Sequence, residues 1–572
     1  AHINYHYGDE TMIAMHGAVT GDKFIIGRQR YSVLVMPQMK NFSPEVYAMV
    51  QQFVAAGGKV LAVRNHVEDS RFYIGGEPAD GFSALTDKII WFDTETELAA
   101  ALHLHTASSP VVKAGTAPAE VDNFDAQLGE IAFTRRYFDD LAGTPAEVYY
   151  FTNSDLKHGY DAEIYLSGKS VERFEPMTGE FVPVCFKTAA DGRLVVPHYF
   201  CSVGDLVLAV RTAAFSAPTV DFHRRDPAQL ESGAPAICLD GDYHIDAMAT
   251  NLLTLDYCSF AFDGERQAEN EYVLSIQDRM LRLKRPVNLK MDFDFYIADD
   301  YDFTADLFLI MEIPQLFSLA VNGRTMAMDD CGFLFDPAFR KINIGKAARI
   351  GRNTITLQTL FSQPDSVYKC IEAAAIFESE KNKLSYAMEI EAIYLAGNFG
   401  VKTVGEFQSL EREAVRCPRG FTLGRRPETA AIGKVHEAGL PFFCGKINLS
   451  RDFTVEPGQE HGRYLVFNRQ MAIVSRFRIN GHEINPLIWK PFSVCLDGLL
   501  LPGVNHLEIE LTNSLRNLLG PHHLAEGESY AVGPFSFYKE PGVFAKNWGG
   551  GQVKWSDDYC LVEFGIDRLR IV

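Results

Sequence analysis

The chain has little of what marks several large classes of protein. Only 4 of its 572 residues are Trp, and no cysteine occurs before Cys185. No run of 18 or more apolar residues is present, so no transmembrane helix is predicted. Basic residues number 54 against 74 acidic ones, which leaves a net charge of −20. Nucleic acids and anionic membranes both attract basic surfaces, so we expect neither as a partner.

The cysteines are few and scattered. All 10 lie between Cys185 and Cys560, and none belongs to a Cys-x-x-Cys pair. This spacing fits neither a zinc site nor the disulfide framework of a small secreted domain. We expect mostly buried free thiols in a reducing compartment, which favours a cytoplasmic over a secreted location. No cofactor is predicted, while a structural calcium ion stays open.

Two turn signals with similar spacing organise the second half of the chain. Asn480-Gly481 suits a type I′ hairpin, which needs positive φ at both central residues. Gly503-Val504-Asn505 then opens a strand in which polar and apolar residues alternate. Asn322-Gly323 and Gly351-Arg352-Asn353 repeat this construction. The repeat predicts two related β-sandwich modules; the alternative is that such turns recur by chance in a chain rich in strands.

Residues 1–105 have the pattern of an α/β domain. A nearly all-apolar run at residues 31–37 is typical of a buried parallel strand. Ser43-Pro44-Glu45 combines an N-cap, a first-position proline and a first-turn acid, and Gly57-Gly58 ends that helix. A second apolar run at residues 60–63 completes a β-α-β unit. A further helix is predicted at residues 93–103.

The remainder is predicted to be mainly β. Residues 106–145 are interpreted as a linker and a helix, since apolar residues recur with helical spacing between Glu120 and Asp140. Residues 146–215 predict a small β domain. Residues 238–403 and 404–572 predict two jelly rolls. The predicted fold class is therefore multidomain and mainly β, with an incomplete, flavodoxin-like α/β domain at the N-terminus.

The second module carries a family resemblance. Its Asn-Gly turn, the segment Trp489-Lys490-Pro491-Phe492 and the strand ending at Asn513 resemble the galactose-binding-type jelly roll of family 2 glycoside hydrolases. The tail from Asn513 to His523 resembles large multidomain bacterial hydrolases related to that family and to the α-L-rhamnosidases of family 106. The resemblance implies the C-terminal, non-barrel region of such an enzyme. It also implies a carbohydrate ligand and a catalytic barrel upstream in the same polypeptide.

The N-terminal α/β part resembles the glutamine-amidotransferase-like domain that follows the barrel in several glycoside hydrolases. A working amidotransferase needs a cysteine nucleophile on a tight elbow, and this part has no cysteine. His66 therefore has no nucleophile to activate. We interpret the part as degenerate and structural. In the family, a first strand and helix precede the stretch at residues 2–5, so we expect the polypeptide to continue upstream.

No catalytic acid or base is assigned. Glycoside hydrolysis usually needs two carboxylates at the C-terminal ends of barrel strands, and eight β/α repeats cannot be found in the sequence. Four close acidic pairs are interpreted as solvated strand faces or turns. They are Asp292/Asp294, Asp299/Asp300, Asp329/Asp330 and Asp557/Asp558.

Aromatic and polar side chains near the C-terminus are candidates for binding sugar. Tryptophans can stack on sugar rings, and Gly549-Gly550-Gly551 would permit close backbone approach. The alternative is that these are buried aromatics. The two adjacent histidines follow Gly-Pro and are expected on a loop, pointing opposite ways, without a shared metal. The candidate carbohydrate-binding residues are Trp489, Arg516, Asn517, His522, His523 and Trp548.

The favoured hypothesis is a non-catalytic region that supports a catalytic barrel of the same polypeptide and binds sugar. The alternative is a stand-alone carbohydrate-binding or adhesion protein. An active amidotransferase-like enzyme is the least favoured, because the cysteine is missing.

Overall fold

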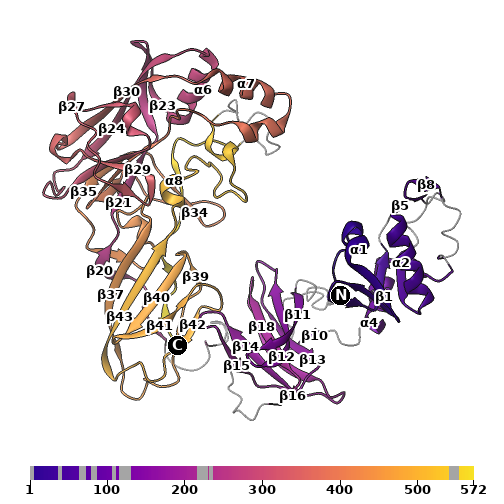
Figure 1. Cartoon of the computed structure of the whole chain (residues 1–572). Coiled ribbons are helices and arrows are strands. Elements are labelled where there is room, and N and C mark those ends of the chain that lie inside the picture. Colours follow the sequence, from indigo (N-terminus) through magenta and orange to yellow (C-terminus); the bar gives the residue numbers. More distant parts are fainter. Residues whose placement is uncertain are drawn as a thin grey trace. The chain divides into compact units, whose positions relative to one another are not determined.

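The computed structural model describes residues 5–36, 41–63, 73–78, 85, 87–105, 111–114, 131–214, 230, 236–539 and 553–572. The chain divides into two compact units, Ala1–Asp226 and Pro227–Val572 (Figure 1). Strands dominate the described residues, which confirms the mainly β prediction. Within these ranges, no helix is both long and apolar enough to cross a bilayer.

The first unit begins with the predicted parallel strands. Strand β4 (Val33–Met36) pairs in parallel with β6 (Lys59–Val63), which pairs in parallel with β9 (Ile90–Phe92). Buried apolar residues of β6 face helices, as parallel strands require. The smaller strands of this part are β1 (Gly17–Thr20), β2 (Lys23–Ile26), β3 (Gln29–Tyr31), β5 (Asn41–Phe42), β7 (Tyr73–Ile74) and β8 (Glu77–Pro78).

Helices α1 (Glu10–His16), α2 (Pro44–Ala55) and α4 (Glu95–His105) accompany these strands. The Ser43 hydroxyl accepts a hydrogen bond of 3.4 Å from the Val46 amide, so Ser43 is the N-cap that the sequence predicts for α2. The predicted helix at residues 93–103 corresponds to α4. His66 lies outside the described residues.

The second part of this unit is a β-sandwich. One sheet has the strand order β10-β13-β17-β16, and the other has the order β11-β12-β18-β14-β15. Its core contains Tyr149, Phe151 and Phe200 between the sheets. The strands are β10 (Val111–Ala114), β11 (Ile131–Leu141), β12 (Thr144–Asn153), β13 (Tyr160–Leu166), β14 (Ser170–Glu175), β15 (Glu180–Pro183), β16 (Lys187–Thr188), β17 (Leu194–Phe200) and β18 (Asp205–Arg211).

The helix predicted between Glu120 and Asp140 is wrong where the structure describes it, because residues 131–141 form strand β11. Ala142 and Gly143 have positive φ angles of 52° and 90° and turn the chain back into β12. Pairing with β12 gives β-branched and aromatic residues a sheet to pack on, which outweighs weak helical spacing. Residues 120–130 lie outside the described ranges.

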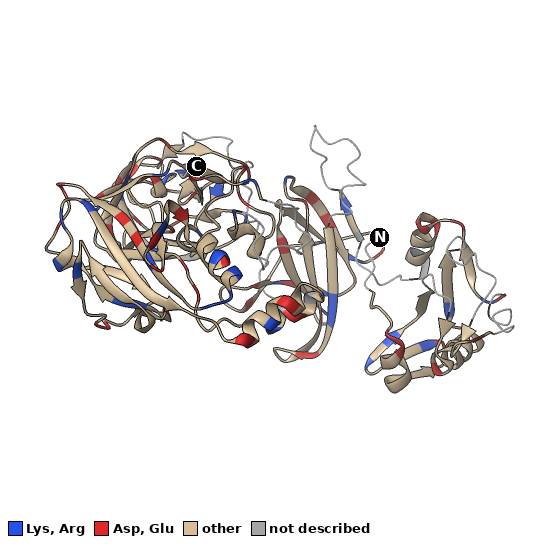
Figure 2. Ribbon diagram, turned by 90° about the horizontal axis from the view of Figure 1, so that it is seen from above, with Lys and Arg blue, Asp and Glu red and all other residues tan. Residues whose placement is uncertain are grey.

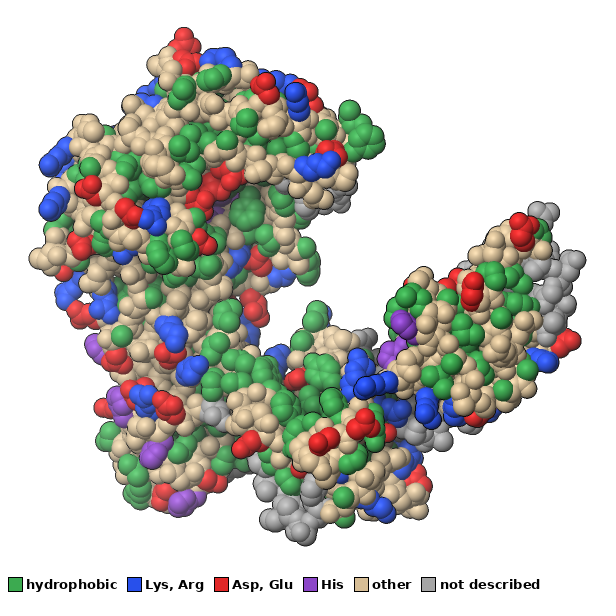
Figure 3. Space-filling view, viewed as in Figure 1, with side chains coloured by type: hydrophobic (Ala, Val, Ile, Leu, Met, Phe, Trp, Pro, Cys, Tyr) green, Lys and Arg blue, Asp and Glu red, His purple; other side chains and the backbone are tan. Residues whose placement is uncertain are grey.

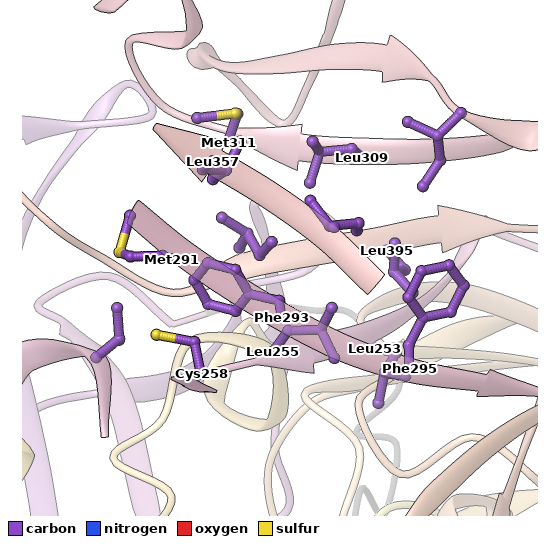
Figure 4. Packing of buried hydrophobic residues seen from close by; sticks show 14 of the residues in the cluster. Leu253, Leu255, Cys258, Met291, Phe293, Phe295, Leu309, Met311, Leu357 and Leu395 are labelled. Atoms are coloured by element: carbon purple, nitrogen blue, oxygen red, sulfur yellow. The ribbon is translucent and has the colours of Figure 1, made fainter. Parts of the chain in front are cut away.

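The first sandwich of the second unit has a sheet of order β21-β31-β25-β29-β28 and a sheet of order β23-β22-β24-β30-β26-β27. Large apolar side chains from both sheets, including Phe293, Leu309 and Leu395, point toward one another between them (Figure 4). The elements are β21 (Asn251–Leu255), β22 (Tyr257–Phe262), β23 (Glu265–Tyr272), α6 (Val273–Leu283), β24 (Val287–Ile297), β25 (Leu307–Met311), β26 (Ser318–Val321), β27 (Arg324–Met326), β28 (Phe333–Leu334), β29 (Asp336–Asn343), β30 (Gly351–Phe361), α7 (Asp365–Ala374) and β31 (Ile393–Gly397).

The second sandwich has sheets of order β36-β20-β37-β43-β40-β41 and β19-β46-β38-β42. Its core is a separate cluster of buried side chains, which includes Phe467 and Phe477. The strands are β19 (Ile237–Cys238), β20 (Asp242–Met248), β36 (Thr429–Ala431), β37 (Gly445–Val455), β38 (Tyr464–Val466), β40 (Val474–Ile479), β41 (His482–Leu487), β42 (Ser493–Cys495), β43 (Gly503–Asn513) and β46 (Arg570–Ile571).

Short elements complete this unit. They are β32 (Gly400–Thr403), β33 (Gln408–Ser409), β34 (Ala414–Cys417), β35 (Phe421–Gly424), β39 (Arg469–Gln470), α8 (Arg516–Leu519), β44 (Tyr559–Val562) and β45 (Ile566–Asp567).

The two sandwiches exchange strands across the sequence boundary predicted at residues 403 and 404. Strand β20 precedes the first sandwich in sequence but pairs with β37 of the second, and β19 pairs with β46. In the opposite sense, β35 pairs in parallel with β24 of the first sandwich. The two modules are therefore not contiguous segments. Their finer assignment as jelly rolls stays a prediction.

Both sandwiches contain the same asparagine pair, at the turns that the sequence singles out. The Asn322 side-chain amide donates to Asn353 Oδ1 at 2.8 Å, and the Asn480 amide donates to Asn505 Oδ1 at 2.8 Å. The amide nitrogens of Asn353 and Asn505 each donate to two backbone carbonyls, at 2.7 and 3.0 Å. This shared geometry supports the predicted kinship of the two modules, and we call it the asparagine frame.

Candidate functional site

The two predicted histidines lie inside the second unit, around one carboxylate. His523 Nε2 lies 3.0 Å from Asp256 Oδ2, and His522 Nδ1 lies 3.8 Å from the same oxygen. The Tyr559 hydroxyl donates to the other carboxylate oxygen. Asp256 directly follows β21 of the first sandwich, whereas its three partners come from the C-terminal part of the chain. We call this group the Asp256 cluster.

The histidine rings converge, although adjacent side chains were expected to point apart. Residues 521–523 are not in a strand, because they lie between helix α8 and an isolated bridge from Leu524 to Trp555, so strict alternation does not apply. The outer ring nitrogens also have partners. His522 Nε2 lies 2.9 Å from the Asn517 carbonyl oxygen, and His523 Nδ1 lies 2.9 Å from the Ser556 carbonyl oxygen.

Electrostatics favour an ionised Asp256 beside a neutral His522. Burial alone would raise the pKa of Asp256, but hydrogen bonds and charge from His522 and His523 outweigh it and hold the pKa below its usual value. Burial lowers the pKa of His522, and burial beside Asp256 raises the pKa of Tyr559 well above its usual value. A buried charge with several hydrogen-bond donors is stable as long as all of them remain.

The neighbouring candidates are also engaged within the protein. The Asn517 side chain donates to the Val562 carbonyl at 3.0 Å and accepts from the Val562 amide at 2.8 Å. Asn517, His522 and His523 are 0%, 6% and 1% exposed, so no ligand reaches them in this conformation. His522 and His523 join the C-terminal segment to Asp256 of the first sandwich, whereas Asn517 binds Val562 within the C-terminal segment. Sugar binding by these three residues stays a prediction.

The remaining candidates do not join this cluster. Arg516 Nε donates to Glu528 Oε2 at 2.7 Å, while its two terminal nitrogens are buried without a hydrogen-bond partner among the described residues. Trp489 is half-buried in the second sandwich, and none of the contacts described for the Asp256 cluster involves it. Trp548 and the adjacent glycines lie outside the described residues.

Three glutamates that the sequence did not single out line a cavity of about 110 Å³ in the first sandwich. Glu312 directly follows β25, and Glu389 and Glu391 lie just before β31. Ile390 between them is buried, so its two neighbours project away from the core, as expected in extended structure. Apolar and aromatic side chains, among them Met311, Phe317, Tyr386 and Met388, complete the wall. We call this site the acidic cavity.

The pKa values of the three carboxyl groups in the acidic cavity are raised. Burial, with the charges of Glu312 and Glu389, raises the pKa of Glu391 to about 7, although its side chain stays accessible to solvent. Burial also raises the pKa of Glu389 and of Glu312. Among the described residues, none of the three forms an ion pair with a lysine or arginine. A cavity with several perturbed carboxylates and mixed walls is a common form of functional site.

Charges from the acidic cavity and from the Asp256 cluster both act on Tyr394. Burial raises the pKa of Tyr394, and the charges of Glu391, Asp256 and Glu312 add to this effect. Burial and the charges of Asp278, Glu389 and Glu391 raise the pKa of Tyr538 to about 12. Acidic side chains also gather beside hydrophobic surface on the first sandwich in Figure 3.

The four acidic pairs singled out in the sequence have the structural partners expected of strand faces and turns. Asp292 and Asp294 accept hydrogen bonds from Thr356 and Thr354 on the neighbouring strand, at 2.6 and 2.7 Å. Asp557 accepts from the Tyr257 hydroxyl at 2.9 Å. The other pairs contain Asp300, in an ion pair with Lys402, and Asp330, in an ion pair with Arg340. In the part of the chain that the structure describes, no three His, Cys, Asp or Glu side chains are arranged to hold a metal ion.

Comparisons with known proteins find glycoside hydrolases among solved structures. No protein-family model and no curated protein matches the chain. A rhamnosidase from Novosphingobium sp. PP1Y is 17% identical over 67% of this chain and 35% of its own, with a TM-score of 0.26. An α-L-rhamnosidase from Streptomyces avermitilis, solved with L-rhamnose, is 12% identical over 71% and 33%, with a TM-score of 0.18. A β-D-mannosidase from Dictyoglomus thermophilum is 11% identical over 52% and 33%, with a TM-score of 0.17.

The chain spans about a third of the length of these solved proteins. The amidotransferase-like interpretation of residues 1–105 finds no support among them and stays a prediction.

Proposed function

We propose that this chain is a non-catalytic β-sandwich region of a carbohydrate-active glycoside hydrolase, and that its acidic cavity binds carbohydrate hydroxyl groups. The observation that carries the binding site is the set of three carboxylates without a described ionic partner, beside aromatic and methionine side chains. The accessory role rests on the resemblance of the sequence to the non-barrel regions of family 2 and family 106 enzymes, in which a barrel upstream performs hydrolysis.

Carboxylates suit this ligand because of their hydrogen-bonding chemistry. An ionised carboxylate only accepts hydrogen bonds, and sugar hydroxyls donate them. A hydrogen bond to a charged group contributes about 1.5–3 kcal/mol, more than one between neutral groups. Apolar and aromatic wall residues such as Phe317 and Tyr386 would contact the carbon face of a sugar ring. Ligand sites commonly combine a few polar groups with such a wall.

Sugar binding at the acidic cavity should depend on pH. Because the pKa of Glu391 is about 7, its carboxylate is largely protonated at pH 6 and largely ionised at pH 8. Only the ionised form offers its full set of acceptors, so affinity for a neutral sugar should rise between these two pH values. Calorimetric titration with neutral mono- and oligosaccharides at both pH values measures the effect.

The test variant carries two substitutions in the acidic cavity, Glu389→Gln and Glu391→Gln. Its matched control is Glu265→Gln, on the exposed hairpin after β22. The double variant should lose affinity by about 10-fold or more, which corresponds to about 1.4 kcal/mol. The Glu265 variant should bind as the unaltered protein does. Equal binding by all three proteins would remove the acidic cavity from the proposal. Hydrolysis of aryl glycosides by this chain alone would overturn the non-catalytic role.

A further inference from the structure

The outer face of one sheet in the first sandwich is hollowed. An open depression of about 640 Å³ lies over β22, β24 and β30, on the side of the sheet that faces away from the core. Its polar lining includes Ser259, Arg266, Asn288, Lys290, Asp292 and Gln358. We call this depression the outer hollow. It is distinct from the acidic cavity, whose Met291 and Leu357 point inward from the same strands.

The second sandwich supplies an internal reference for this face. Strands β24 and β30 pair over eleven positions, from Val287 with Phe361 to Ile297 with Gly351. Strands β37 and β43 also pair over eleven positions, from Gly445 with Asn513 to Val455 with Gly503. The asparagine frame occupies the same end of both pairs. Each position on one outer face therefore has a counterpart on the other.

Ion pairs cover the outer face of the second sandwich. Lys446 Nζ lies 3.1 Å from Glu510 Oε1, and Arg476 Nε lies 3.6 Å from the same oxygen. Arg478 lies 3.5 Å from Glu508. Basic and acidic residues are interspersed along the strands of the molecule (Figure 2). Long paired side chains of this kind lie across a sheet and leave no room over it.

The first sandwich has short or neutral side chains at all five of these positions. Ser318 faces Gln358 across the strands where Arg476 faces Glu510, and Ala320 faces Thr356 where Arg478 faces Glu508. Asn288 stands at the position of Lys446. Two of these replacements, Asn288 and Gln358, line the outer hollow. One ion pair remains in it, between Lys290 and Asp292 at 2.8 Å, and Thr356 donates to the same carboxylate at 2.6 Å.

We propose that the outer hollow is a second carbohydrate-binding site, which takes a short, neutral oligosaccharide. Its volume is within the usual range of about 300–1,000 Å³ for ligand pockets. The amides of Asn288 and Gln358 both donate and accept hydrogen bonds, as sugar hydroxyls do, and the Ser259 hydroxyl, which donates to the Glu269 carbonyl at 2.6 Å, can still accept one. Because Lys290 is paired with Asp292 and Arg266 lies 3.3 Å from Glu269, the charges of the lining are compensated, and the lining favours hydroxyl groups over a charged ligand. This inference goes beyond the acidic cavity and does not depend on sugar binding there.

The test fills the outer hollow with the ion pair of the second sandwich. Asn288→Lys with Gln358→Glu recreates the Lys446–Glu510 pair on two exposed residues that line the outer hollow. Lys446→Asn with Glu510→Gln is the matched control in the second sandwich. The probe is an array of immobilised neutral di- and trisaccharides, and hits are measured by calorimetry with thermal unfolding as the folding check. We expect the filled variant to bind at least about 10-fold more weakly, and the control variant to bind unchanged.

The same titrations separate the two sites. Binding in the outer hollow should survive Glu389→Gln with Glu391→Gln and should stay constant between pH 6 and 8, since no glutamate lines it. If sugar binding is lost in that double variant and kept in the filled variant, the outer hollow is not a sugar-binding site and the acidic cavity is. An unaltered protein that binds no neutral sugar on the array would overturn both.

Discussion

The two sandwiches of the second unit share a frame and differ in their surfaces. Each has two eleven-residue strands in full register and an asparagine pair at the adjoining turns. The second sandwich covers its outer sheet with ion pairs, whereas the first has short neutral side chains there and an acidic cavity beside its core. One frame therefore tolerates either a closed or an open surface. The open one is where we expect ligands.

The largest expected effect comes from breaking the link between the first sandwich and the C-terminal segment that holds His522, His523 and Tyr559. Asp256→Ala would leave His523 and the Tyr559 hydroxyl buried without their acceptor. Removing one partner of a buried pair typically costs about 3–5 kcal/mol of unfolding free energy. Urea unfolding measures the loss, followed by tryptophan fluorescence, since Trp555 stacks on His523 at 4.6 Å between ring centroids.

A control for this substitution is available in the second sandwich. Asp452 also contacts a histidine, with Oδ1 2.7 Å from His506 Nδ1, but the pair is largely exposed. Asp452→Ala should cost no more than about 1 kcal/mol, because solvent screens such a pair. If the two substitutions cost the same, the Asp256 cluster does not hold the C-terminal segment on the first sandwich.

The frame itself predicts equal losses in the two sandwiches. Asn353→Ala and Asn505→Ala each remove the same contacts: one backbone amide at 2.9 or 2.8 Å and two carbonyls. Each should cost about 1–3 kcal/mol, the usual penalty for unpaired buried polar groups. Urea unfolding of the two variants makes the comparison. If the frame is shared, their losses in free energy of unfolding should differ by less than about 1 kcal/mol. A loss in one sandwich alone would contradict the kinship.

The turns of the asparagine frame could be predicted from sequence because their signals are local, whereas the hydrogen bonds between the asparagines could not. Asn-Gly requires positive φ at adjacent positions, and the structure has 51° and 78° at Asn322 and Gly323, and 51° and 82° at Asn480 and Gly481. Turn chemistry of this kind needs no tertiary information. The β-α-β unit formed by β4, α2 and β6 could also be predicted from local sequence signals. Strand β11 was misassigned because its partner β12, which decides between helix and strand, is not visible to a periodicity argument.

The sites could not be predicted because distant segments assemble them. His523 contacts Asp256 across 267 positions of sequence, so the sequence alone does not show that His523 is buried. Glu389-Ile390-Glu391 carried a signal, two acids flanking an apolar residue, but only folding brings Glu312 beside them. The outer hollow is defined by a comparison of registers between the sandwiches, which requires the strand pairing first.

The acidic cavity predicts that the first sandwich becomes less stable as pH rises. The usual pKa of Glu391 is near 4.5 and the folded pKa is about 7, so the folded state holds a proton that the unfolded state releases. The stabilising contribution is complete below pH 4.5 and is lost as pH rises through 7. Glu391→Gln should therefore raise the melting temperature at pH 8 and leave it nearly unchanged at pH 4.5. A shift of equal size at both pH values would show that the folded pKa of Glu391 is ordinary.

The smallest expected effect concerns the ion pairs that close the second sandwich. Glu510→Gln removes the partner of Lys446 and Arg476, yet these side chains lie in solvent, where such pairs contribute about 0–1 kcal/mol. Unfolding in low and high salt should therefore show little difference between this variant and the unaltered protein. The ion pairs would then fill space on the outer face and contribute little to the free energy of unfolding. The first sandwich can therefore have neutral residues at these positions without a large loss of stability. A loss well above 1 kcal/mol would mean that the open face of the first sandwich needs a compensating interaction elsewhere.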